Sequence, residues 1–166
     1  MKKIYPVLLV CIAILIIAAC LWFIPNATTV DISFHGYVVS SDGEILETVD
    51  IHVNGPKNSY LFKEDQFALR VSTSSDEWSF STPASMGSAR DPYIDVPYLS
   101  FFTHITSSDE QSGGGNFAVS LEDGYFIAGR NHDSTKFLIG STSADTDPSV
   151  ILEYFSEYIA LYFSGT

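Results

Sequence analysis

The chain opens with an unbroken apolar run. From Ile4 to Ile24, 20 of the 21 residues are apolar, and the exception, Pro6, falls in the first turn, where a missing N–H breaks no helical bond. A helix of this length measures about 31 Å, which matches a hydrocarbon core of about 30 Å. We therefore predict a cytoplasmic stub and a single transmembrane helix in residues 1–25.

Basic residues flank only one end of this run. Lys2 and Lys3 precede it, and the next basic residue is Lys57. Lys and Arg are enriched on the cytoplasmic side of a membrane, so the N-terminus is predicted in the cytoplasm and the rest of the chain outside. Residues 26–29 are then a short tether, and residues 30–166 form an extracytoplasmic domain.

Two other interpretations of the apolar run remain open. Ile17-Ala18-Ala19-Cys20 resembles the bacterial lipobox, in which the cysteine becomes lipidated, so Cys20 is a candidate lipid anchor. The run could also be a signal that is cleaved to release a secreted form, although it exceeds the 7 to 15 apolar residues of an ordinary signal. All three interpretations place the domain outside the cytoplasm.

After the apolar run, apolar and polar residues alternate, which is typical of half-buried antiparallel strands. Two long alternating segments flank Asp42-Gly43, and this arrangement predicts a β-hairpin. A Pro-, Ser- and Gly-rich segment at 82–97 predicts an irregular functional loop. About eight strands are expected, at residues 30–39, 49–54, 67–71, 78–80, 98–105, 117–121, 125–128 and 137–139.

The last segment changes to helical spacing. Asp147 and Pro148 suit the N-cap and the first position of a helix, which predicts a helix over 148–163. Its apolar arc covers well over half the circumference, more than a helix needs to cover a sheet. We therefore take Phe155, Tyr158 and Tyr162 as candidate residues for binding a partner.

Composition narrows the function classes. The whole chain has a formal net charge of −12. All 20 acidic residues but only six basic ones follow the apolar run, so the exported part carries −14 and should repel nucleic acid. Cys11 and Cys20 both lie inside the run, which leaves the domain without a disulfide, a thiol nucleophile or a thiolate metal site.

Candidate chemistry is sparse. The chain contains no G-x-S-x-G, no H-E-x-x-H and no phosphate-binding glycine loop followed by Lys. His52 shares the polar face of its strand with Asp50 and Asn54, so Asp50 and His52 are candidate metal ligands or catalytic groups. Tyr93, Tyr98 and Phe102, in and after the irregular loop, are candidate binding aromatics.

The sequence as a whole predicts an α+β protein, in which a transmembrane helix precedes an antiparallel β domain closed by a C-terminal helix. The most favoured function is a non-enzymatic protein-interaction module beside the membrane, without a cofactor. The alternatives are a module that binds a ligand or a metal ion, and a hydrolase that uses His52 and Asp50.

Overall fold

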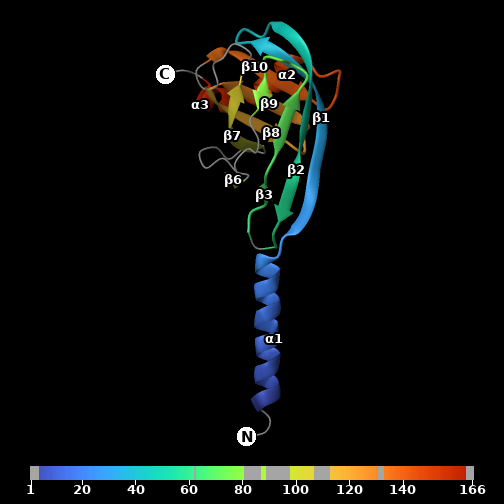
Figure 1. The fold of residues 1–166 in the computed structure, drawn as a ribbon, viewed down its shortest axis with the longest axis vertical. Coiled ribbons are helices and arrows are strands. Elements are labelled where there is room, and N and C mark those ends of the chain that lie inside the picture. Colours follow the sequence, from blue (N-terminus) through green and yellow to red (C-terminus); the bar gives the residue numbers. More distant parts are fainter. Residues whose placement is uncertain are drawn as a thin grey trace.

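The computed structural model describes most of the chain and shows a helix followed by a β domain (Figure 1). Tyr93, a predicted binding residue, lies outside the described part. The described residues are 4–61, 63–80, 87–88, 98–106, 113–130 and 133–163. Of residues 4, 21, 87, 88, 106, 133 and 134, only the backbone is described.

The predicted N-terminal helix forms. α1 spans Ile4–Phe23, and its described side chains are exposed on every side of the helix, which projects from one end of the domain (Figure 1). Among the residues described, no helix combines the length and the apolar composition that crossing a bilayer requires, so the transmembrane assignment of this segment is contradicted.

The described strands form one antiparallel sheet, which curls into a half-barrel (Figure 1), and the antiparallel pairing agrees with the prediction. Of the ten strands within the described residues, nine follow the order β5-β7-β8-β9-β10-β1-β2-β3-β6, and β4 pairs with β2. β6 lies within the segment predicted to be irregular. The strands are β1 Asn26–Ser40, β2 Ile45–Ser59, β3 Gln66–Phe67, β4 Arg70–Thr73, β5 Ser79–Phe80, β6 Gly87–Ser88, β7 Leu99–Thr106, β8 Gly113–Ser120, β9 Tyr125–Arg130 and β10 Asp133–Ser141.

The predicted hairpin is the longest feature of the sheet. β1 and β2 each have 15 residues, and residues 26–29, expected as a tether, already belong to β1. Gly43 closes the turn with a φ of 86°, a conformation that glycine adopts without steric cost. A register shift between Val38 and Val39 then sets the pairing that continues down the hairpin, in which Ser33 lies opposite His52.

Both faces of the sheet carry apolar clusters. On the concave face, side chains from β1, β2, β4, β7, β8, β9 and β10 meet, with Phe34, Phe117 and Phe126 stacked or tilted against one another. On the convex face, Val39, Ile127 and Ile139 pack against the C-terminal helical segment. Successive side chains of a strand point to opposite faces of the sheet. Because both faces of the central strands are buried, these strands are almost entirely apolar.

The C-terminal helix begins as predicted but is interrupted. Asp147 caps α2 (Pro148–Tyr154) by accepting a hydrogen bond of 2.8 Å from the backbone N–H of Ser149. Phe155 leaves helical geometry at ψ 15°, and α3 follows at Ser156–Tyr162, so the predicted single helix 148–163 is two helices. Hydrogen bonds from Ser149 lower the pKa of Asp147, which keeps the cap charged.

Candidate functional site

Three polar side chains meet on the convex face of the β1–β2 hairpin. His52 Nδ1 lies 3.2 Å from the Ser33 hydroxyl oxygen, and His52 Nε2 lies 3.3 Å from the Asp31 carboxylate. Asp31 and Ser33 are two residues apart on β1 and so point to the same face, while Ser33 is directly opposite His52 on β2. The hairpin register therefore creates this cluster.

Further polar groups surround the cluster. His35 lies opposite Asp50, Asn54 lies opposite Asp31, and β4 places Ser72 opposite His52. The backbone N–H of Asp50 donates to the Ser74 hydroxyl at 2.9 Å, which fixes the edge of the site. The surface here forms an open depression with a volume of about 570 Å³, lined by residues of β1, β2 and β4 and by Ser74.

This arrangement has a defined chemical capability. A carboxylate can only accept, so with a neutral imidazole Asp31 holds the proton on Nε2 and leaves Nδ1 to accept from the Ser33 hydroxyl. That order of groups matches the serine–histidine–aspartate arrangement of hydrolases, with the two ring nitrogens exchanged. The side chains of His52 and Asp31 are 41% and 71% exposed, so water screens their attraction.

The sequence singled out His52 together with Asp50 and Asn54, and it missed Asp31 and Ser33, the residues that contact the imidazole ring. Asp50 and His52 share a face, but the carboxylate that lies against the His52 ring is that of Asp31. Extending the hairpin back from Asp42-Gly43 could have located Asp31 and Ser33. Within the described ranges, no three His, Cys, Asp or Glu side chains gather as metal ligands.

The predicted binding aromatics occupy different environments. Tyr98, Phe155 and Tyr158 are at most 3% exposed and pack together between helix and sheet, with ring centroids 4.9 Å and 5.6 Å from Tyr98. Tyr162 is half-buried, with its ring centroid 4.7 Å from that of Tyr158. Phe102 is 51% exposed on β7. The wide apolar arc of the C-terminal segment is therefore covered mainly by the domain itself.

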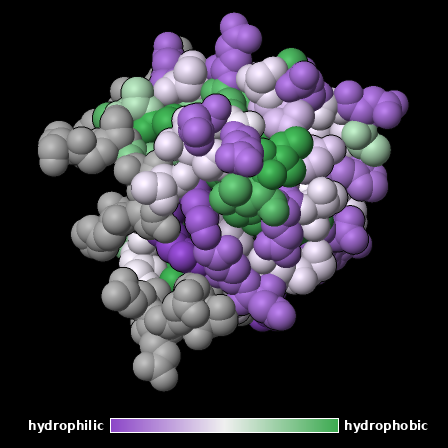
Figure 2. All heavy atoms as spheres, turned by 90° about the horizontal axis from the view of Figure 1, so that it is seen from above, coloured by the Kyte–Doolittle hydropathy of each residue, from purple (hydrophilic) through white to green (hydrophobic). Residues whose placement is uncertain are grey.

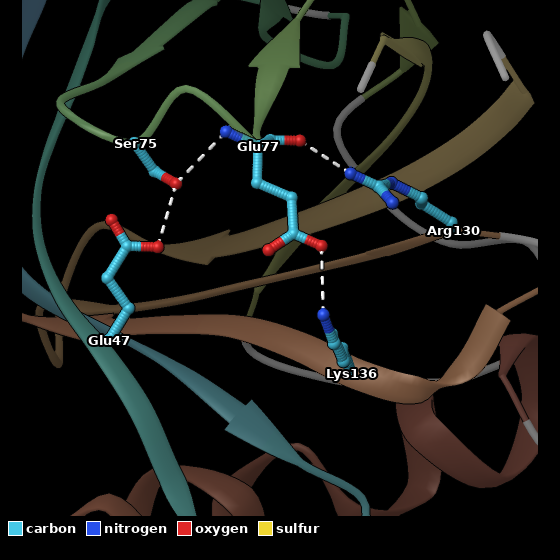
Figure 3. A network of polar contacts seen from close by, with 5 residues as sticks. All are labelled: Glu47, Ser75, Glu77, Arg130 and Lys136. Atoms are coloured by element: carbon cyan, nitrogen blue, oxygen red, sulfur yellow. Dashed lines mark hydrogen bonds and ion pairs between the residues drawn. The ribbon is translucent and has the colours of Figure 1, made fainter. Parts of the chain in front are cut away.

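A second polar network joins the end of β4 to the other side of the half-barrel (Figure 3). The Glu77 carboxylate pairs with Lys136 Nζ at 3.0 Å, and the Glu77 carbonyl accepts from Arg130. The Ser75 hydroxyl accepts from the Glu77 N–H at 3.3 Å and donates to Glu47 at 3.0 Å. These contacts hold the β4–β5 segment against β9 and β10, so we assign the network a structural role.

Exposed apolar side chains lie at both ends of the domain. Ile45 and Leu46, 49% and 47% exposed, directly follow the turn of the β1–β2 hairpin. That turn lies at the end opposite α1 (Figure 1), and Figure 2 shows an apolar area among polar residues on the same end. At the other end, Lys63 Nζ lies 4.8 Å from the ring centroid of Phe23, the last residue of α1.

Comparison with known proteins assigns no family and no function to this chain. No family model matches the chain, and no curated protein or solved structure shows significant similarity to it.

Proposed function

We propose that this chain is a membrane-attached protein-interaction module whose β domain lies outside the cytoplasm. The observation that carries the proposal is α1, an apolar helix exposed on all sides and joined to β1 through only Ile24 and Pro25. A helix without a polar face needs an apolar environment around its whole circumference. Lipid supplies that environment, so we propose that α1 attaches the chain to the membrane without crossing the bilayer, since no helix among the described residues is long and apolar enough to cross it.

The positions of the cysteines support the placement of the domain and the type of attachment. The domain has no cysteine, as suits a compartment where thiols would oxidise. Cys20 is exposed on α1, so a lipid chain on its sulfur could contribute to the attachment.

The partner surface that we propose is the end opposite α1, around Ile45 and Leu46. Both side chains are about half exposed, and they lie on a long hairpin that carries them away from the helix. Exposed apolar side chains surrounded by polar ones are typical of protein-binding surfaces. By contrast, Phe155 and Tyr158 are buried and offer a partner no free face.

Site-specific cross-linking in native membranes tests this proposal. A photoreactive residue at position 46 should give one reproducible protein adduct, and Leu46→Asp should abolish co-purification of that protein. Leu161 is the matched control because it is 48% exposed but lies on α3. Equal adducts at positions 46 and 161, or equal effects of Leu46→Asp and Leu161→Asp, would refute binding at this end.

The His52 cluster supports a second candidate function, hydrolysis with Ser33 as the nucleophile. The hydrogen-bonded order Asp31–His52–Ser33 is the observation that favours it. A fluorophosphonate probe should then label Ser33, as its oxygen displaces fluoride and His52 takes the proton. Asp31→Asn should slow labelling, whereas Asp50→Asn should not. Labelling that survives Ser33→Ala, or none in the native protein, would exclude this function.

A further inference from the structure

The junction between α1 and the domain gathers exposed apolar side chains around one lysine. β2 ends at Ser59, and the connection that follows it brings Lys63 to the C-terminal end of α1 (Figure 1). Phe23 and Ile24 are each 67% exposed, and Leu61, from the domain side, is 66% exposed. Lys63 Nζ lies 4.8 Å from the Phe23 ring centroid and 5.3 Å from that of Tyr60.

We infer that Tyr60, Leu61 and Lys63 form a lipid-contacting surface, here called the basal surface, which continues the apolar surface of α1 onto the domain. This inference rests on the proposed membrane attachment and adds a specific contact of the domain with the bilayer. Lys63 has the arrangement of a residue at the membrane interface, because its stem can lie along apolar groups while its ammonium remains hydrated. Tyr60 matches the aromatic residues that are enriched at the same level.

The local charges indicate how the basal surface binds. Lys57 pairs with Asp65 at 2.8 Å, which neutralises both, and Lys63 is followed by the exposed Glu64. Together with the neighbouring Lys57, Glu64 and Asp65, the basal surface therefore has no net charge, and the domain as a whole is strongly acidic. Attraction to anionic headgroups cannot dominate here, so we assign the contact to insertion of Leu61 and Tyr60 at the interface of the bilayer.

The connection between helix and domain makes this contact geometrically simple. Only Ile24 and Pro25 separate α1 from β1, so the base of the domain stays within a few residues of the helix end. The cation–π contacts of Lys63 with Phe23 and Tyr60 further join the β2–β3 connection to α1. When α1 lies in lipid, this contact brings Leu61 to the lipid surface.

Photocross-linking to lipid tests the inference. The full-length chain, in phosphatidylcholine vesicles, would carry a photoreactive residue at position 12, 61 or 161. Ile12 reports on α1, Leu61 on the basal surface, and Leu161 is an exposed leucine on α3. We expect lipid adducts at positions 12 and 61 in several-fold excess over position 161, as measured by mass spectrometry.

The three positions separate the two proposals. Lipid adducts at 12 but only background adducts at 61 would overturn the basal surface and leave the membrane attachment standing. Background adducts at 12 would refute the membrane attachment itself. A protein adduct at 61 in place of lipid would also overturn the inference. Lys63→Glu serves as a second variant, because a carboxylate beside Leu61 should reduce the adducts at 61 and leave those at 12 unchanged.

Discussion

The contact between Glu77 and Lys136 should stabilise the half-barrel by coupling its two sides. The pair joins the β4–β5 segment to β10 at 3.0 Å, with side chains 33% and 37% exposed. Two unit charges about 4 Å apart attract by about 4 kcal/mol at an effective dielectric constant near 20. Desolvation and the ordering of two long side chains offset most of this attraction, so we expect a coupling energy of about 1 kcal/mol, at the upper end for partly exposed pairs.

A double-mutant cycle measures that coupling directly. Glu77→Gln, Lys136→Met and the double variant would be unfolded with urea as full-length chains in one mild detergent, and followed by near-UV circular dichroism. Each single variant should lower the free energy of unfolding by about 1 kcal/mol, and the double variant should lose less than the sum of the two single losses. The control cycle, Asp31→Asn with His52→Gln, concerns a more exposed pair and should give a coupling near zero.

The coupling also has a clear refutation. Independent substitutions add to within about 0.3 kcal/mol, so a Glu77–Lys136 coupling smaller than this would show that the pair does not join the two sides. A loss from Glu77→Gln that persists in full when Lys136 is already methionine would lead to the same conclusion. In that case the stabilisation would have to come from the other Glu77 contacts, its carbonyl with Arg130 and its N–H with Ser75.

Three further substitutions test separate parts of the fold. Gly55→Ala should destabilise the protein by about 2 kcal/mol or more and lower its urea midpoint, because φ is 152° and the new Cβ would lie 2.1 Å from the Ala68 carbonyl oxygen. Ile51→Ala should cost about 2–5 kcal/mol in the same assay because Ile51 is 1% exposed in the core. Burial first, and Asp123 next, raise the pKa of Tyr154 to about 12. Its stabilising contribution is therefore complete below pH 10 and is lost as the pH rises through 12, and Tyr154→Phe should flatten that decline in a thermal denaturation series.

The alternation of apolar and polar residues predicted most of the strands, because burial of one face of a strand produces that alternation. Residues 30–36 alternate because one face packs on the core and the other faces water, and Asp42-Gly43 provides the turn. The interruption at Phe155 had no such signal, since apolar spacing continues through it and only the fit of α2 and α3 to the sheet decides the geometry. β6 is two residues long, and it pairs with β3 without any alternation of its own.

The candidate site was predictable only in part, because its geometry depends on pairing between strands. His52 and Asp50 stood out because they alternate with apolar residues on one strand. The partners Asp31 and Ser33 lie 21 and 19 positions before His52, and only the register brings them near. Similarly, helical spacing identified the apolar face of residues 148–163 but could not show that the sheet covers Phe155 and Tyr158.

The length of the β1–β2 hairpin separates the proposed functions in space. Fifteen residues at about 3.3 Å each give a strand of at most about 50 Å, so Leu46 stands far from the basal surface even after the sheet curls. Ser33 is seven residues from the start of β1, which puts the His52 cluster about halfway along. A base held on lipid would orient the hairpin away from the bilayer and leave the opposite end accessible. On the proposed attachment, a partner that binds Ile45 and Leu46 would have to reach a level tens of ångströms above the membrane surface, whereas a lipid-derived substrate at Ser33 would require the domain to tilt.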